Sequence, residues 1–290
     1  MSISRHGEQA RAAATQAGDD AERLARRSSG WLVPLGRAGY AANGLVYAIV
    51  GALAVQAAIG IGGDITDTNG ALGHIIDAPG GRWLLGGVAV GLLGYALWRV
   101  LQAVLDTEHK GTQPGGLLAR AGYAFAAVVY GGLALSAVAM ALGRGSQPDG
   151  EQSTQDRTAW LMSQPFGHWL VMLVGLATIA AGVSQLVRAY RAPFRDELRT
   201  DKMRPQEQRL ALAAGRLGYA ARGVVFGLVG LFLVIAGVQA QPEEARGLGG
   251  ALAALAQQPF GPWLLGVVGL GLLAYGAFLL VEAAYRRMVV

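Results

Sequence analysis

Six stretches that are almost free of charge divide the 290 residues of this chain. Four contain no Asp, Glu, Lys or Arg, and two contain a single arginine, Arg99 or Arg222. The hydrocarbon core of a bilayer is about 30 Å thick, and a helix of about 20 apolar residues crosses it. We therefore predict an all-α integral membrane protein with six transmembrane helices, at about 38–60, 82–105, 120–142, 167–190, 215–239 and 261–284.

The composition agrees with a membrane protein. Only 15% of the residues are charged and 53% are hydrophobic, whereas soluble domains carry roughly 25% charged residues. The chain contains no cysteine, which excludes a disulfide scaffold, a cysteine-based zinc site, an iron–sulfur cluster and a cysteine nucleophile. We do not expect a soluble enzyme.

Basic residues are distributed unevenly between the segments that join the predicted helices. The termini and the connections 106–120 and 188–216 hold 18 Lys and Arg residues, whereas the loops 61–82, 143–166 and 240–260 hold four. Basic residues accumulate on the cytoplasmic side of membrane proteins. We therefore expect a protein of the plasma (inner) membrane with both termini in the cytoplasm.

Three segments of the chain repeat one another. Each opens with an arginine followed two and three residues later by Gly-Tyr, and each later contains Pro-x-Gly-x-Trp-Leu. The arginines and tryptophans are Arg37 and Trp83, Arg120 and Trp169, and Arg216 and Trp263. These pairs are 46, 49 and 47 residues apart. Because each unit holds two helices, the three units are predicted to be parallel repeats about an axis along the membrane normal.

The repeats organise the chain into five segments: a polar cytoplasmic tail (1–34), repeat 1 (35–111), repeat 2 (117–192), a basic cytoplasmic linker (193–213) and repeat 3 (214–288). Apolar residues spaced by three and four precede each motif proline, as in Leu72, Ile75 and Ile76. This spacing predicts a short helix on the outer surface in every repeat. The motif tryptophans Trp83, Trp169 and Trp263 are expected to anchor the outer interface of the membrane.

The first helix of every repeat carries a shared face. Counted from the opening arginine, aromatic residues occur at positions 3 and 10 and a small residue occurs at position 7, which places them on one side of a helix. Small residues allow close approach of membrane helices. We expect the odd-numbered helices to meet through these faces around a pseudo-threefold axis. The residues are Tyr40, Gly44, Tyr47, Tyr123, Ala127, Tyr130, Tyr219, Gly223 and Phe226.

These motifs resemble those of the bacterial membrane proteins grouped as domain-of-unknown-function family 1206. That domain is a two-helix unit commonly found in three tandem copies, and the resemblance covers about residues 35–288. Repeat 2 departs from the pattern, since it has no tyrosine that matches Tyr95 and Tyr275. The resemblance implies a plasma-membrane protein and brings no established activity or catalytic residues.

Catalytic, cofactor and metal sites are not expected. The four histidines lie in tails, loops or at a helix edge, so none is placed to hold a haem inside the bundle. No hydrolase, metalloprotease or nucleotide-binding motif occurs in a suitable context. Asp64 and Asp67 lie near His74, and a solvated acidic loop explains them better than a weak cation site.

Charged and polar residues inside the spans form the second group of candidates. We expect charged side chains in these positions to reach the membrane rim or to pair there. The alternative is a polar vestibule near the cytoplasmic surface, on the pseudo-threefold axis. The residues are Arg37, Gln102, Arg120, Arg188, Arg216, Arg222 and Glu282.

The linker between repeats 2 and 3 is strongly basic. Arg191, Arg195, Arg199 and Lys202 recur every three or four residues, which predicts that the fourth membrane helix continues to Pro205 with one basic stripe. Such a stripe favours contact with anionic lipid headgroups. The alternative is that these residues only enforce orientation.

The sequence thus favours a non-enzymatic membrane protein that acts as a scaffold or accessory protein or organises lipid. The alternative is a channel or transporter for a small solute or anion, with arginines in its cytoplasmic vestibule. The expected partners are the lipid bilayer, an anionic phospholipid and another membrane protein. No nucleic acid is expected to bind.

Overall fold

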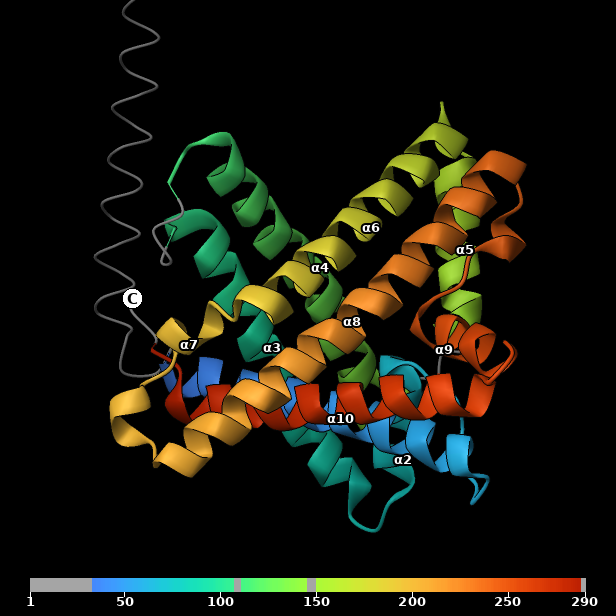
Figure 1. Cartoon of the computed structure of the whole chain (residues 1–290). Helices are drawn as coiled ribbons and strands as arrows, with labels where there is room; N and C mark the ends of the chain where they lie inside the picture. Colours follow the sequence, from blue (N-terminus) through green and yellow to red (C-terminus); the bar gives the residue numbers. More distant parts are fainter. Residues whose placement is uncertain (1–32, 107–110, 145–149, 288–290) are drawn as a thin grey trace, which may run out of the picture.

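A computed structural model describes residues 33–106, 111–144 and 150–287 of the chain (Figure 1). The predicted N-terminal tail lies, except for Val33 and Pro34, outside the described residues. Helices make up nearly all of the described part, in which no β-strand forms. One isolated antiparallel bridge joins Leu198 to Arg286.

Six helices are long and apolar enough to cross a membrane. They are the first helix (Val33–Ile59), α3 (Gly81–Leu105), α4 (Pro114–Ala141), α6 (Gly167–Arg191), α8 (Pro205–Gln239) and α10 (Gly261–Tyr285). The prediction of an all-α, multi-pass membrane protein with six spans is therefore confirmed.

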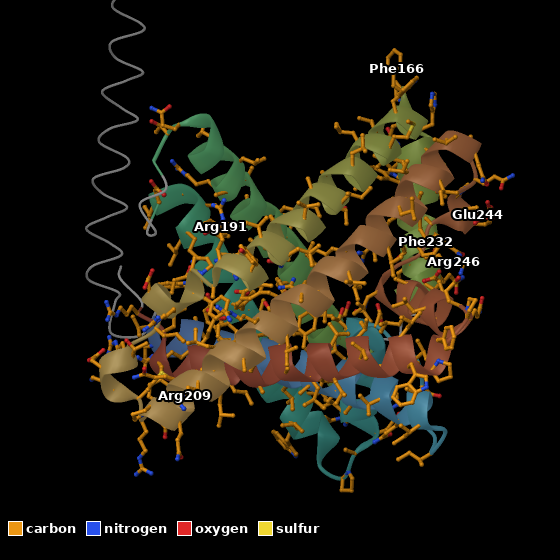
Figure 2. The ribbon with its side chains drawn as sticks, in the orientation of Figure 1. Phe166, Arg191, Arg209, Phe232, Glu244 and Arg246 are labelled. Atoms are coloured by element: carbon orange, nitrogen blue, oxygen red, sulfur yellow. The ribbon has the colours of Figure 1, made fainter. Side chains whose placement is uncertain are left out.

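Each repeat contains the predicted short helix before its second membrane helix. These are α2 (Thr68–Asp77), α5 (Gly150–Met162) and α9 (Leu248–Ala256), with the 3₁₀ turn η2 (Pro242–Glu244) ahead of α9. They lie at one end of the bundle, which we call the loop face. The opposite end, where α3, α6 and α10 finish, is the terminal face. Figure 2 shows Phe166 and Arg246 on the loop face, far from Arg209 at the start of α8.

The glycine of the Pro-x-Gly-x-Trp-Leu motif is needed because the chain passes very close to the preceding short helix at this position. The residue before it turns the chain with a positive φ: 73° at Gly80, 60° at Phe166 and 62° at Phe260. A Cβ on the following glycine would overlap a backbone carbonyl of the preceding short helix, such as that of Ile75 behind Gly81. The three motifs therefore make the same turn from the short helix into the second membrane helix.

Within repeats 1 and 3 the two membrane helices pack in the same way. A Cβ on Gly39 would lie 2.6 Å from the backbone nitrogen of Tyr95, and one on Gly218 would lie 2.6 Å from the Cα of Tyr275. Both tyrosines are twelve residues after the motif tryptophan. The first helix thus packs on α3 as α8 packs on α10.

Neighbouring repeats pack through the small residues of their first helices. Gly44 approaches the carbonyl of Gly276 on α10, so the first helix contacts repeat 3. Gly223 approaches Gly182 and Leu186 on α6, so α8 contacts repeat 2. Extensive contact between α4 and α3 joins repeat 2 to repeat 1. In each case the first helix of one repeat meets the second helix of the repeat before it, in cyclic order.

The two helices of repeat 2, by contrast, do not pack along each other: α4 and α6 form no extended contact. In Figure 1 the upper ends of α4 and α6 point apart, and each helix packs on a different neighbour, α4 on α3 and α6 on α8. At the position of the close-packed Gly91 and Gly271, α6 has Ala177, and Ala181 replaces the tyrosine. Gly122 of α4, the counterpart of Gly39 and Gly218, faces open space. The expected pseudo-threefold packing is thus regular between repeats and interrupted within repeat 2.

The linker does not continue the fourth membrane helix, and that prediction is wrong. Helix α6 ends at Arg191, and Ala192 has a positive φ of 49° before Pro193. The residue before a proline disfavours the α conformation, which explains the break. The linker instead forms α7 (Phe194–Glu197) and the 3₁₀ turn η1 (Thr200–Lys202), and Pro205 begins α8 rather than ending a helix. The buried Phe194 ring packs on Tyr219 and Phe278.

Replacing Gly223 with alanine tests the contact between α8 and α6. The new Cβ would lie 2.7 Å from Leu186 Cδ2 and 3.0 Å from the carbonyl oxygen of Gly182. We expect a loss of about 1 to 3 kcal/mol in stability, because overpacking forces the helices apart. The control is Gly227→Ala, one turn further along α8, where an added Cβ meets nothing within 4 Å. Equal melting temperatures of the two variants in detergent would contradict the contact.

Candidate functional site

One position is polar in all three repeats. It lies nineteen residues after the motif tryptophan and holds Gln102, Arg188 and Glu282. Each residue is also three positions before the end of its helix, α3, α6 or α10. At 1.5 Å per residue this places the three Cα atoms about 4.5 Å inside the terminal face. Gln102 and Glu282 are buried, and each is 1% exposed.

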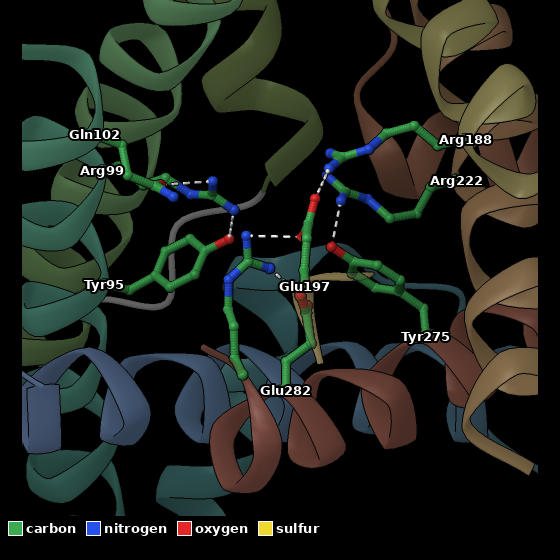
Figure 3. Close-up of polar contacts among 9 residues, drawn as sticks. Tyr95, Arg99, Gln102, Arg188, Glu197, Arg222, Tyr275 and Glu282 are labelled. Atoms are coloured by element: carbon green, nitrogen blue, oxygen red, sulfur yellow. Dashed lines mark hydrogen bonds and ion pairs between the residues drawn. The ribbon is translucent and has the colours of Figure 1, made fainter. Parts of the chain in front are cut away.

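Other polar residues surround this position and form a site between the α3–α4 pair and the α6–α8 pair (Figure 3). We call this set the arginine–tyrosine cluster. Helix α3 contributes to it from one side and α6 and α8 from the other, while α7 and α10 complete it. Its members are Tyr95, Arg99, Gln102, Arg188, Glu197, Arg222, Tyr275, Glu282 and Arg286.

Both carboxylates of the cluster are ion-paired. Arg286 donates through Nη1 to Glu282, and its Nη2 lies 2.9 Å from Glu197 Oε2. Arg188 lies 3.2 Å from the other oxygen of Glu197. The chain after α10 is held against the linker, since Arg199 N donates to Tyr285 O and Arg287 N donates to Glu197 O. Glu197 thus joins α6, α7 and the end of α10.

Arg99 and Arg222 bind neutral groups instead. Arg99 donates to the hydroxyl of Tyr95 and, at 2.9 Å, to Gln102 Oε1. Arg222 donates to the hydroxyl of Tyr275 at 2.5 Å. Neither arginine has a carboxylate within ion-pair distance among the described residues. The cluster therefore contains four guanidinium groups and only two carboxylates.

Aromatic rings line both of these arginines. The guanidinium carbon of Arg99 lies 4.7 Å from the centre of the Tyr95 ring and 5.5 Å from that of Tyr123 on α4. The guanidinium carbon of Arg222 lies 4.5 Å from the Tyr275 ring centre and 5.1 Å from that of Tyr47. A cation over an aromatic face gains about 2 kcal/mol when it is desolvated. The rings thus offset part of the cost of removing the arginines from water.

Several buried polar atoms at the cluster have no hydrogen-bond partner. They include the Nε atoms of Arg99 and Arg222 and the hydroxyl of Tyr40. Asn43 and Tyr40 are each 0% exposed. Asn43 also occupies the same repeat position as Arg222, six residues after the opening arginine. Most buried polar groups in proteins are hydrogen-bonded, so this concentration of free donors marks the site as unusual.

Four of the seven predicted vestibule residues meet in the cluster: Gln102, Arg188, Arg222 and Glu282. The three arginines that open the repeats do not meet there. Arg120 donates to the carbonyls of Ala103 and Val104 and so caps the end of α3. Arg216 is exposed on α8, and Arg37 is half-buried with an unpaired Nε. The structure therefore does not place these three arginines in the cluster.

The predicted packing residues are mostly buried, and their partners are chiefly the second helices of the repeats. Tyr47 packs edge-to-face on Tyr275, and Tyr130 packs in the same way on Tyr95. Tyr40 contacts Tyr95 as Tyr219 contacts Tyr275. Ala127 is buried as well, whereas Tyr123 and Phe226 are half-buried beside Arg99 and Arg222. Arg222 of α8 also reaches the Tyr47 ring of the first helix.

The remaining predicted residues lie on the surface. Trp83, Trp169 and Trp263 are 88%, 59% and 78% exposed in the first turns of α3, α6 and α10. Arg191, Arg195 and Lys202 are exposed around α7, and Arg199 is half-buried. Asp67 caps α2 by accepting from the amides of Asn69 and Gly70. Within the described ranges, no group of three His, Asp or Glu side chains could hold a metal ion.

Sequence reasoning missed part of the cluster. Counting from the motif tryptophan finds Tyr95, Tyr275 and the shared polar position, so those residues were accessible to it. Glu197 and Arg286 lie outside the repeated pattern, in the linker and after α10. The folding of α7 back onto the bundle brings Glu197 to the cluster, and Arg286 reaches it one helical turn after Glu282.

Three segments of the chain, residues 38–106, 121–192 and 217–286, match the family model described as Domain of Unknown Function (DUF1206). The chain belongs to this family. It is 38% identical over 266 residues to a Bacillus subtilis (strain 168) protein named "Uncharacterized protein YxxB". That match covers 92% of this chain and 95% of the relative. No solved structure matches the chain significantly.

Replacing Glu197 with glutamine tests the ion-paired part of the cluster. Arg188 and Arg286 would lose a shared counter-charge while their burial stayed the same. Breaking a buried ion pair costs about 3 to 5 kcal/mol, and we expect the lower end because Glu197 is partly exposed. Thermal unfolding in detergent measures the loss. The same change at the exposed Glu243 should have little effect, and equal melting temperatures would show that Glu197 is not a structural counter-ion.

Proposed function

We propose that this member of the DUF1206 family is a non-enzymatic membrane protein that binds an anionic group at the arginine–tyrosine cluster. It thereby organises lipid or serves as an accessory to other membrane proteins. The observation that carries the proposal is the excess of cationic groups inside the bundle: the half-buried Arg99 and Arg222 contact only neutral partners. A charge inside the membrane costs several kcal/mol and usually has a function.

Anion binding accounts for the geometry of these two arginines. Each keeps an unpaired Nε, and the free hydroxyl of Tyr40 adds a neutral donor. Guanidinium groups bind phosphate and carboxylate oxygens through charge-assisted hydrogen bonds. A bound anion would neutralise part of the excess charge and use donors that the protein leaves unpaired.

The chemistry of the cluster favours binding over catalysis. A guanidinium remains protonated at physiological pH, so it is a poor acid or base. The two carboxylates, Glu197 and Glu282, are both engaged by Arg286. The cluster thus presents fixed positive charge rather than a group ready to transfer a proton.

A channel for small anions is the second candidate, and the same cationic excess favours it. A conducting path would have to continue from the cluster to the loop face. There α2, α5 and α9 pack against one another, with Glu151 accepting from Gly247 N at 3.1 Å. Anion flux into liposomes that contain the purified protein separates the two candidates, because a static binding site conducts nothing.

Anion binding predicts selective stabilisation of the purified protein. Inorganic phosphate, glycerol 3-phosphate or phosphatidylglycerol should raise the melting temperature of the delipidated protein. A ligand present at 100 times its Kd adds about 2.7 kcal/mol. We expect the Arg99→Gln/Arg222→Gln variant to lose this gain. The control variant Arg82→Gln/Arg216→Gln changes exposed arginines on the same two helices and should keep it. If none of the three anions stabilises the wild type more than the double variant, the proposal fails.

The basic residues support a further part of the proposal: the terminal face lies in the cytoplasm and the membrane is the plasma membrane. The 18 to 4 distribution of Lys and Arg between the two sides favours this orientation. A cytoplasmic reporter enzyme fused after Val290 should be active in intact cells. Activity of only an exported reporter at the same position would reverse the orientation.

A further inference from the structure

The arginine–tyrosine cluster lies between α4 and α6, two helices that form no extended contact with each other. Both helices bring a side chain to it: the Tyr123 ring of α4 lies 5.5 Å from the Arg99 guanidinium, and Arg188 of α6 pairs with Glu197. Figure 3 shows Arg99 and Arg188 on opposite sides of the site. The cluster is therefore located between the α3–α4 pair and the α6–α8 pair.

Helices α4 and α6 are the least buried of the six spans. In the most apolar 18-residue windows of α6 and α4, 17% and 28% of the residues are buried, compared with 50% in α3 and α10. Exposed apolar side chains follow both helices along their length, including Phe125, Val128 and Leu135 on α4 and Leu173, Leu176 and Val183 on α6. A polar site thus lies beside two largely apolar surfaces.

The part of the cluster nearest the terminal face lies at the depth of a lipid headgroup. The position shared by Gln102, Arg188 and Glu282 is one helical turn from the terminal face, and Arg99 is six residues, about 9 Å, from the end of α3. A phospholipid places its phosphate at this level of a leaflet and its acyl chains deeper in the membrane. The apolar flanks of α4 and α6 extend in that same direction, toward the loop face.

We propose that the ligand of the arginine–tyrosine cluster is an anionic glycerophospholipid, which reaches the cluster sideways from the bilayer between α4 and α6. Its phosphate binds Arg99 and Arg222, and its acyl chains lie along α4 and α6. This inference rests on the proposed anion binding and names the ligand. A free phosphate would match the charge but leave the two apolar flanks without a role. A second copy of the chain would cover the flanks but leave the excess charge in place.

Binding of intact lipid and of its soluble headgroup separates this inference from the broader proposal. Native mass spectrometry of the delipidated full-length protein would count bound phosphatidylglycerol, phosphatidylcholine and glycerol 3-phosphate. We expect retention of phosphatidylglycerol at least tenfold above that of phosphatidylcholine, and loss of this preference in Arg99→Gln/Arg222→Gln but not in Arg82→Gln/Arg216→Gln. Glycerol 3-phosphate that binds as well as the lipid would leave an anion site and overturn the lipid ligand. Binding of neither would overturn both.

Photo-crosslinking of the wild-type protein tests the route without any substitution. Phosphatidylglycerol with a diazirine in one acyl chain would be reconstituted with the protein in nanodiscs and activated by light. We expect the labelled peptides to come mainly from α4 and α6. Labelling spread evenly over the outward faces of all six spans would overturn the lateral route, and so would a protein–protein crosslink that joins α4 or α6 to a second copy in place of lipid.

Discussion

The cost of burying guanidinium groups is the constraint on which the interior of this protein depends. Arg286 and Arg188 meet that cost by pairing with Glu197 and Glu282. Arg99 and Arg222 meet it only in part, through tyrosine hydroxyls and aromatic rings. The repeat places Tyr95 and Tyr275 in equivalent positions of repeats 1 and 3. Arg99 and Arg222, which have no carboxylate partner, therefore each have a tyrosine neighbour in their own repeat. The aromatic packing of the bundle and the chemistry of the cluster are thus parts of one arrangement.

Close backbone approach at small residues positions these side chains. Gly39 and Gly218 bring the backbone of the first helix in repeats 1 and 3 against a tyrosine of the second helix, which directs both tyrosines into the bundle. In repeat 2, alanines at positions 177 and 181 of α6 remove the glycine contact and the aromatic ring together. The loss of both explains why α4 and α6 diverge. The departure of one repeat from the pattern therefore separates α4 from α6 beside the charged interior of the bundle.

Periodicity and spacing were sufficient to predict the six spans, the repeats and the short helices, since each depends on local residue pattern. They also predicted Gln102, Arg188, Arg222 and Glu282 as members of a polar site. They failed for the linker, where the regular spacing of basic residues indicated a continuous helix and Pro193 ended it. They failed again for Arg120. This arginine opens repeat 2, and its side chain caps the end of α3 in repeat 1. Glu197 and Arg286 could not be predicted, since only tertiary folding brings them together.

The shared polar position shows how repetition produces an asymmetric site. Three copies of one helix–turn–helix unit place a side chain at the same depth, one turn from the terminal face, yet those side chains are an amide, a cation and an anion. The carboxylate of Glu282 is occupied by Arg286 from the next turn of the same chain segment, and Gln102 accepts from Arg99. The position six residues after each opening arginine, on the first helix of the repeat, carries Asn43, Ala126 and Arg222. It therefore adds one more cation to the cluster and no acid. The differences between the repeats therefore leave the cluster with more cations, on α3, α6 and α8, than the two carboxylates on α7 and α10 can pair.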